Sequence, residues 1–413
     1  MNLIEHQVVP PSGSTGAVVV GKADGKASDG QKPKKPMVPV TGSGRPSKAM
    51  EERSRTYAGN DADECRDKKR LQHVRQSPLH GLHSDGFRRR ESYTEAVVAT
   101  LVPSLDHLVT PRIGGRILST GRAVPELREE LRRIPSVRNA VSVVSCFAQA
   151  ATVMGAAALS HRVWVWVIAF ILMGRAHAQL AALMHEAAHR TLFRNRRAND
   201  IVGRWLLGYV GFTNTDGYRR VHMAHHREEF GPEEPDLALY AAYPISKASM
   251  RRKIVRDATG QTGWRLLKQQ LSALSNGDAR AKRTVCKIYG VQLLLAIIAA
   301  LAGYPLAYWL LWFAPYMTVW RVINRLRAIA EHGGMQRSKD RRQTTHSVRQ
   351  HWLSRTFVVP YWIGWHLAHH CDSGIPMRNL PRYHRELIAS GFVSEQLEYR
   401  SYRQLWRALG SKE

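Results

Sequence analysis

The sequence predicts an all-α integral membrane protein with four transmembrane helices in two hairpins and a histidine-rich dimetal site on the cytoplasmic side. Three observations predict this fold. Two long stretches lack charged side chains, Lys and Arg lie mainly outside them, and eight of the 19 histidines fall into three tight groups. The mean hydropathy of −0.33 is typical of a soluble protein, but it averages the apolar stretches with a long polar remainder.

Residues 1–122 are expected to form a mostly disordered basic extension. Gly, Ser, Pro and charged residues dominate it, and no apolar period is long enough to bury a core. It lacks the pattern of a cleaved secretory signal. The extension is either a regulatory tail or the product of a start codon placed too early.

The first predicted hairpin follows. Residues 139–160 contain no charged side chain and have about the length of one bilayer crossing. His161 and Arg162 form the expected turn, and the apolar run over 163–184 carries one charged residue, Arg175. We therefore predict transmembrane helices at about 139–160 and 163–184.

The second predicted hairpin lies within residues 288–320, which are free of charge. One helix of that length would span roughly 50 Å, too long for a single crossing of a core about 30 Å thick. Gly303 and Pro305 supply a turn in the middle. We predict two crossings, at about 288–302 and 305–325.

The charge distribution predicts the orientation. The chain has 61 Lys and Arg against 33 Asp and Glu, a net charge of +28. The two predicted outer turns hold a single Arg, so the positive-inside rule places both termini in the cytoplasm. Cytoplasmic loops thus account for the basic charge without a nucleic-acid partner. The excess of Arg over Lys favours a bacterial origin, and hence the bacterial inner membrane.

The histidine groups predict a metal centre. They read HEAAH at 185–189, HMAHH at 222–226 and HLAHH at 366–370. Spacings of three and four residues put the imidazoles on one face of a helix, where they can share a metal. Eight imidazoles exceed the roughly six ligands that one first-row metal accepts, so we expect two ions. The four cysteines form no CxxC pair, which excludes a disulfide framework or a thiolate zinc module.

A ninth histidine, His332, is expected at the same depth. By helical rise, His185, His189 and His332 lie roughly 33–40 Å from the outer ends of their helices, at or just beyond the inner face of the bilayer core. Alternatively, His332 only caps its helix before Gly333 and Gly334.

All-imidazole ligation favours iron, copper, zinc or nickel over magnesium or calcium. Glu186, Glu331 and Asp372 adjoin these histidines and could orient imidazole N–H groups. Alternatively, they are solvated charges.

Four segments carry a recognisable family pattern: LMHEAAHRTLFRNRRAND, YRRVHMAHH, RAIAEHGG and WHLAHHCDSGIPMRNLPRYH. With them, the chain resembles the membrane fatty acid desaturase superfamily over roughly residues 124–387, and within it the bacterial branch that contains the dihydrorhizobitoxine desaturases. The resemblance implies four transmembrane helices, a cytosolic helical cap that holds the dimetal site, and a non-haem diiron centre with O₂ as co-substrate. Carried over by position, it implies nine metal ligands: His185, His189, His222, His225, His226, His332, His366, His369 and His370.

The resemblance implies a membrane desaturase domain over residues 123–390, followed by an amphipathic segment, 391–413. The implied activity introduces a double bond into a fatty acyl or related aliphatic chain, whose tail would enter an apolar tunnel. No HPGG or CxxC motif is present, so a separate ferredoxin, rubredoxin or cytochrome b5-type protein is the expected electron donor. Hydroxylases and ketolases of the same superfamily remain alternatives.

The third group departs from the NxHLEHHLFP pattern of many relatives at Gly364, Ala368 and Cys371. Ala328 stands where acyl desaturases can carry Asn. These departures leave the choice of substrate open.

Two rival interpretations remain. The first group also spells HExxH, in which Glu186 would be the general base of a zinc metalloprotease, but this leaves His332 and the other two groups without a role. A basic membrane-anchored scaffold or nucleic-acid binder would use the clusters at 32–35 and 88–90, which have little aromatic interleaving.

Overall fold

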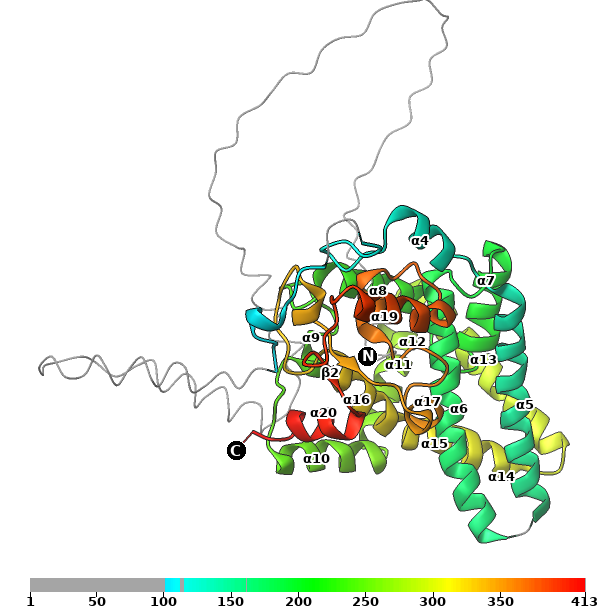
Figure 1. Ribbon diagram of the computed structural model, residues 1–413. Helices are drawn as coiled ribbons and strands as arrows, with labels where there is room; N and C mark the ends of the chain where they lie inside the picture. The colour runs from blue at the N-terminus through cyan, green and yellow to red at the C-terminus, as the bar shows by residue number, and fades with distance from the viewer. Residues whose placement is uncertain (1–100, 112–114, 161, 413) are drawn as a thin grey trace, which may run out of the picture. The chain divides into compact units, whose positions relative to one another are not determined.

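The computed structural model defines residues 101–111, 115–160 and 162–412, and this part of the chain is mainly helical (Figure 1). Its α-helices are α4 (Pro125–Leu131), α5 (Ser136–Ser160), α6 (Val163–His189), α7 (Arg196–Val202), α8 (Thr215–Glu228), α9 (Leu237–Tyr240), α10 (Lys247–Ala258), α11 (Gln261–Leu271), α12 (Ala273–Asn276), α13 (Ala279–Leu301), α14 (Pro305–Tyr308), α15 (Ala314–Met317), α16 (Val319–His332), α17 (Trp352–Phe357), α18 (His366–Cys371), α19 (Leu380–Ala389) and α20 (Tyr402–Leu409). Short 3-10 turns are η1 (Leu105–His107), η4 (Arg341–Gln343) and η5 (Met377–Asn379), and π-helical turns are η2 (Gly203–Gly208) and η3 (Trp309–Phe313). Strands β1 (Ser347–Val348) and β2 (Glu398–Tyr399) pair in parallel, Ser347 with Glu398.

Three helical segments are long and apolar enough to cross a bilayer: Pro125–Ser160, which ends in α5, then α6, and α13. α5 packs along α6, and α13 packs against α14, so these helices lie side by side (Figure 1). The apolar segments 139–160, 163–184 and 288–302 thus fall in helices of sufficient length and hydropathy, and their crossing of the membrane stays a prediction. α13 begins earlier than expected, at Ala279, where the side chain of Asp278 caps its first turn.

The fourth predicted crossing, at 305–325, is not one regular helix. α14 passes into the π-helical η3 and then α15, and Thr318 interrupts the path with φ −124° and ψ −83° before α16 begins. Pro315 accounts for part of this irregularity, because proline lacks an N–H and its ring clashes with the preceding helical turn. The wider π turn accommodates that missing bond. A continuous fourth helix is therefore wrong, while a fourth crossing stays a prediction.

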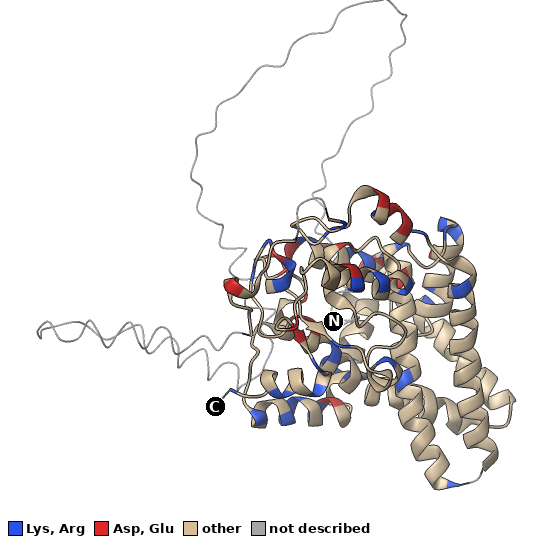
Figure 2. Cartoon of the chain, viewed as in Figure 1, with Lys and Arg blue, Asp and Glu red and all other residues tan. Residues whose placement is uncertain are grey.

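Large apolar side chains lie exposed on the helices expected in the bilayer. They include Val141, Val144, Ile168, Ile171, Leu293, Leu294, Ile298, Leu306 and Trp309. Soluble proteins rarely expose a contiguous apolar patch of this extent. Figure 2 shows few charged residues on α14 and on the ends of α5 and α6 next to their shared turn. The Lys and Arg residues of α13 all lie within its first nine positions, and the rest of this helix is uncharged. This surface supports a position in a membrane.

Part of the predicted N-terminal extension is packed. The Leu101 N–H donates to the carbonyl of Gly334, and Ile117 and Ala123 are buried and joined by a β-bridge. The Tyr383 hydroxyl donates to the carbonyl of Gly121. Residues 101–111 and 115–122 therefore differ from the expectation of disorder, and residues 1–100 lie outside the described part.

The C-terminal helix α20 has one buried face. Leu405 and Leu409 are fully buried, whereas Arg403 and Arg407 are exposed. The indole N–H of Trp406 donates to the carbonyl of Leu326 at 2.9 Å. α20 thus supports α16, the helix that ends at His332.

α6 and α16 approach each other closely at Gly174. A Cβ at this position would lie 2.3 Å from Cγ1 of Val319, which is too short for any real contact. Glycine therefore sets the distance between two helices that each carry histidines of the predicted centre. Gly155 of α5 offers the contrast, since a Cβ there meets nothing within 4 Å.

We expect Gly174→Ala to lower the free energy of unfolding by about 1–3 kcal/mol, because the added methyl overpacks the α6–α16 contact. Gly155→Ala is the matched control, expected to leave stability unchanged or raise it by about 0.5–1 kcal/mol through helix propensity. Thermal unfolding of the two detergent-purified variants measures this. Equal effects would contradict the assigned contact.

Candidate metal centre

Four helices bring together the nine histidines nominated from the sequence. His185 and His189 lie in the last turns of α6, which ends where Arg190 adopts a left-handed conformation (φ 60°). The second group lies in α8, which begins after the Asn214 side chain caps the N–H of Asp216. The third group forms α18, and His332 is the last residue of α16.

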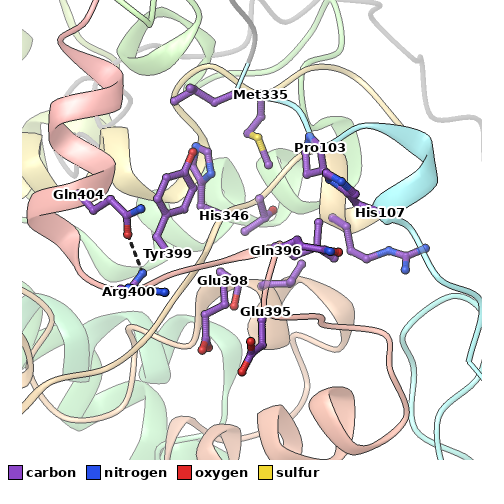
Figure 3. A pocket seen from close by; sticks show the side chains of 16 residues that line it. Pro103, His107, Met335, His346, Glu395, Gln396, Glu398, Tyr399, Arg400 and Gln404 are labelled. Carbon is purple, nitrogen blue, oxygen red and sulfur yellow. Dashed lines mark hydrogen bonds between the residues drawn. The ribbon is translucent and has the colours of Figure 1, made fainter.

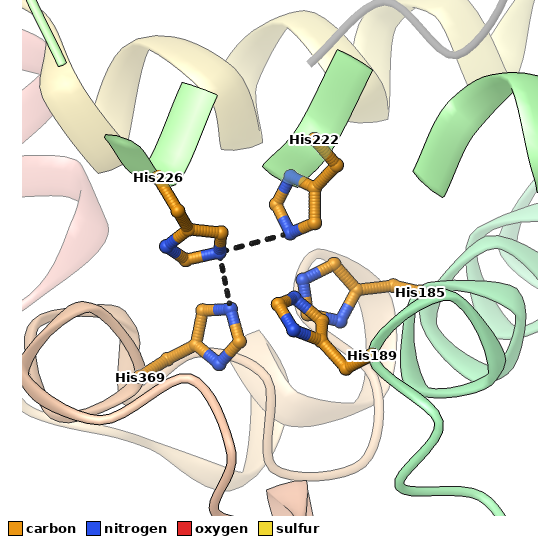
Figure 4. A group of neighbouring side chains, drawn as sticks. All are labelled: His185, His189, His222, His226 and His369. Atoms are coloured by element: carbon orange, nitrogen blue, oxygen red, sulfur yellow. Dashed lines mark hydrogen bonds between the residues drawn. The ribbon is translucent and has the colours of Figure 1, made fainter. Parts of the chain in front are cut away.

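The ring nitrogens converge in two groups. The five-histidine group consists of His185, His189, His222, His226 and His369 (Figure 4), and the four-histidine group consists of His225, His332, His366 and His370. Within each group, one ring nitrogen of every member lies within 4.8 Å of all the others. α8 and α18 contribute to both groups, so the two groups are neighbours. This is the arrangement that two metal ions require.

The distances between ring nitrogens fit ligands of a common ion. Nε2 of His226 lies 3.1 Å from Nε2 of His222 and 3.1 Å from Nε2 of His369. A neutral ring nitrogen holds either a proton or a lone pair, so it cannot donate to one neighbour and accept from another. Two nitrogens bound at right angles to a metal about 2.1 Å away would lie about 3.0 Å apart. Shared coordination therefore explains the distances better than a chain of hydrogen bonds.

Several buried ring nitrogens lack any partner among the described residues. Both ring nitrogens of His185, Nε2 of His189 and Nδ1 of His222 make no hydrogen bond there. Buried polar atoms are rarely left without a partner unless an ion or water fills the place. The donor set, all imidazole, suits a first-row transition metal such as iron. The residues therefore fit the metal centre that the sequence predicts.

Oxygen acceptors fix the orientation of the four-histidine group. Nδ1 of His225 lies 2.8 Å from Oε1 of Glu234, Nδ1 of His332 lies 2.8 Å from the carbonyl oxygen of Thr344, and Nδ1 of His370 contacts Oε1 of Glu229. Carbonyl and ionised carboxylate oxygens only accept, so each Nδ1 carries the proton. Nε2 is left with a lone pair directed into the group.

Burial keeps most of these imidazoles neutral. It lowers the pKa of His332 to about 3 and lowers, well below the ordinary value, the pKa of His222, His226, His366, His369 and His370. Burial also opposes charge on His225, but the hydrogen bond and charge of Glu234 outweigh it and raise the pKa of His225. The neutral imidazole is the form that binds metal.

The acidic residues nominated from the sequence have other partners. The carboxylate of Asp372 binds Arg128 and Arg132 at 2.6 and 2.5 Å, and so ties α4 to the end of α18. Glu331 pairs with Arg327 at 2.6 Å and stays 3.5 Å from Nδ1 of His366. Asp372 thus does not orient an imidazole, and Glu331 does so only from a distance.

Sequence analysis did not identify the three acceptors of the imidazole Nδ1–H groups, which are Glu229, Glu234 and the carbonyl of Thr344. Both acids lie in the segment HHREEFGPEEPD directly after the second group, and that acidic run was the available signal. Thr344 offers no signal, because its contribution is a main-chain oxygen.

Glu186 is turned away from the metal groups. Its carboxylate accepts hydrogen bonds from the Thr191 hydroxyl at 2.9 Å and from the Met377 N–H at 3.1 Å. Its nearest approach to the ring of His185 is 3.9 Å. A zinc protease needs this glutamate as a base at the metal, so the geometry argues against that rival.

A cavity of about 260 Å³ is lined in part by His346, Tyr399 and Gln404 (Figure 3). Leu367, which stands between two predicted ligands, forms part of its wall, as does Thr345 beside Thr344. Most of the other lining residues are polar or charged, among them Glu398 and Arg400. This cavity is therefore not the apolar tunnel expected for a substrate tail.

The chain is similar to known desaturases. The sequence pattern of the fatty acid desaturase family matches residues 92–403. The chain is 26% identical to dihydrorhizobitoxine desaturase of Bradyrhizobium elkanii over 228 residues, which cover 52% of this chain and 65% of that protein. It is also 39% identical to a Delta(5) fatty acid desaturase of Caenorhabditis elegans over 56 residues, which cover 14% of this chain and 12% of that protein. The chain thus spans less than two thirds of either relative.

We expect metal removal to destabilise the protein, because it leaves buried imidazole lone pairs without a partner. Restoring Fe²⁺ to the apo-protein should raise Tm, with a stabilisation of about 2.7 kcal/mol for each bound ion at a free-metal concentration one hundred times Kd. Thermal unfolding with and without Fe²⁺ measures this. The double variant His222→Ala/His225→Ala, altered in both groups, should show no metal-dependent shift. A wild-type Tm indifferent to metal would count against the site.

We expect Glu234→Gln to weaken metal retention by about 10–100-fold, because a neutral amide is a poorer acceptor for the Nδ1–H of His225. The matched control is Glu233→Gln, the same change at an exposed neighbour. Metal content after competition with a chelator gives the comparison. If both variants retain metal equally well, Glu234 does not support the centre.

Proposed function

Because this chain belongs to the fatty acid desaturase family, we propose that it is an O₂-dependent membrane desaturase acting on a fatty acyl or related aliphatic chain. One observation carries the proposal: nine imidazoles from α6, α8, α16 and α18, seven of them buried and those of His189 and His226 half-buried, converge in a five-histidine and a four-histidine group. The proposed metal ligands are the nine histidines of these groups, and the proposed cofactor is a pair of iron ions.

The proposed reaction balances as follows. A –CH₂–CH₂– unit loses two hydrogens to become –CH=CH–, and one O₂ takes up these hydrogens, two external electrons and two protons to give two water molecules. Bound iron would supply the activation of O₂. No side chain has to act as a nucleophile, because both hydrogens leave to the oxidant.

The chain's own residues hold and shield the centre. Glu234, Glu229 and the Thr344 carbonyl hold the protons of three rings at Nδ1, which turns Nε2 of each ring inward. His222, His225 and His369 are at most 2% exposed, so the surrounding helices keep bulk water from the ring nitrogens. A dry, preorganised pocket suits a strong oxidant, since water would divert it.

The setting of the reaction follows from the apolar helices. We propose that α5, α6, α13 and the segment 305–325 cross the bacterial inner membrane, with both termini and the histidine-bearing cap on the cytoplasmic side. The acyl substrate would come from the lipid phase. The electrons would come from a separate ferredoxin, rubredoxin or cytochrome b5-type donor, and the basic cytoplasmic surface would favour an acidic donor.

Hydroxylation by the same centre is the second candidate. Ala328 is the reason to retain hydroxylation as a candidate, because it stands where acyl desaturases can carry Asn. This side chain lies one turn before His332 and is buried beside a small polar cavity. The two outcomes differ only in whether the oxidant removes a second hydrogen or returns a hydroxyl.

We expect a host that expresses the chain to gain an unsaturated lipid or metabolite that is absent with His225→Ala, a variant lacking one proposed ligand. Lipid and metabolite profiling under ¹⁸O₂ measures it. Desaturation leaves no label in the product, whereas hydroxylation leaves one labelled oxygen. No difference between the two hosts would refute both.

Two controls separate the rivals. Deleting residues 2–91, which precede the family match, should leave activity intact, whereas a scaffold that uses the N-terminal region would lose function. Two irons in each purified chain agree with the proposal. One zinc would instead support the protease.

A further inference from the structure

We propose that Arg321 is an anion-binding residue of the substrate site, and that the substrate therefore carries a free carboxylate. The inference rests on the proposed function, since it assigns the substrate class of the same enzyme. It starts from one observation: Arg321, near the start of α16, is 3% exposed, and apart from an interaction with the Tyr316 hydroxyl its guanidinium nitrogens make no hydrogen bond of good geometry to the described residues.

The surroundings of Arg321 do not neutralise it. Its guanidinium carbon lies 4.2 Å from the ring centroid of Tyr316, and the hydroxyl of Tyr316 also interacts with the guanidinium. A cation–π contact and a neutral phenol offset only part of the cost of burying a charge. A buried cation normally needs a paired anion with good geometry. Arg321 also lies within the predicted fourth crossing, where an ionisable side chain marks a functional site.

The acidic residue that lines the same cavity as Arg321 already pairs with another arginine. Arg321 lines a cavity of about 20 Å³ together with Asp257, Arg325 and Asn324. Both oxygens of Asp257 are bound by Arg325, and one also accepts from the hydroxyl of Thr262 at 2.5 Å. Two arginines and one aspartate thus leave the described lining with one uncompensated positive charge. The amide of Asn324 can turn either its nitrogen or its oxygen toward this space.

The cavity lies along the helix that ends at one of the proposed ligands. Its lining continues along α16 to Ala328, one turn before His332. Arg321 and His332 are eleven residues apart on this helix, about 16 Å along its axis. A substrate anchored at Arg321 would therefore offer a carbon far along its chain to the histidines, rather than the carbon next to its carboxyl group.

The size and depth of the cavity favour a carboxylate over a phosphate. A volume of about 20 Å³ holds one water molecule, or one oxygen of a carboxylate. One carboxylate oxygen there can accept a charge-assisted hydrogen bond from the guanidinium, whereas the larger phosphate group does not fit. A lipid phosphate would stay at the membrane surface, whereas Arg321 is almost completely buried.

The test measures binding rather than turnover. Isothermal titration of the metal-loaded full chain in detergent compares saturated straight-chain fatty acids of graded length with their methyl esters. We expect the acid to bind about 10–100-fold more tightly than its ester, as for a hydrogen bond to a charged group. Arg321→Met should abolish this preference, and Arg321→Lys should keep part of it. Arg251→Met, at an exposed arginine of α10, should bind as the wild type does.

Several outcomes would overturn the inference: equal affinity of the wild type for acid and ester, an acid preference that survives in Arg321→Met, or displacement of the acid by inorganic phosphate. Stability gives a second readout. Arg321→Met removes an unpaired charge and should keep or raise Tm, whereas Arg325→Met strands Asp257 and should lower it. A similar fall in both would mean that Arg321 has a protein partner, against the inference.

Failure of this inference and failure of the proposed function look different. Oxidation of ester-linked acyl chains by a protein without acid preference would overturn the carboxylate anchor and leave the desaturase proposal standing. An acid preference that depends on Arg321, with no oxidised product in any host, would do the reverse.

Discussion

The structure depends on the cost of burying imidazole nitrogens. Nine rings from four helices turn nitrogen atoms toward one another in the interior of the protein, where lone pairs cannot all be satisfied by each other. Without an ion, this arrangement would be among the least favourable parts of the fold. One ion in each group would offer the converging nitrogens a common ligand partner. The close α6–α16 contact at Gly174, the support of α16 by α20 and the tie between α4 and Asp372 all hold the helices that carry these rings.

Much of this arrangement follows from local sequence. Spacings of three and four residues fix which imidazoles share a helical face, and helix geometry alone carries that information. His332 was placed by helical rise, which works because the chain from 305 to 332 stays nearly helical despite the π turn at η3. The long apolar segments were equally clear, since only a bilayer accommodates such uninterrupted runs.

The acids around the centre were not predictable in the same way. Asp372 stands two residues after a ligand, but Arg128 and Arg132 arrive from a distant helix and take its carboxylate. Glu229 and Glu234 reach His370 and His225 because the chain turns back after α8. The contacts of these acids with imidazoles and arginines cannot be deduced from neighbouring positions in the sequence, since they depend on the path of the intervening loops in space. The packed segment 115–122 was missed for a similar reason, because its contacts are made to residues far along the chain.

One feature of the four-histidine group bears on how related chains are compared. The Nδ1–H of His332 donates its hydrogen bond to the main-chain carbonyl of Thr344 and not to a side chain. The tautomer of this ring is therefore encoded in the path of the main chain around η4. Evolution can exchange the side chain at 344 without touching the bond, yet an insertion or deletion between 333 and 344 would misalign it. In an alignment of related chains, the number of residues between 333 and 344 should therefore be constant even where the residue at 344 varies.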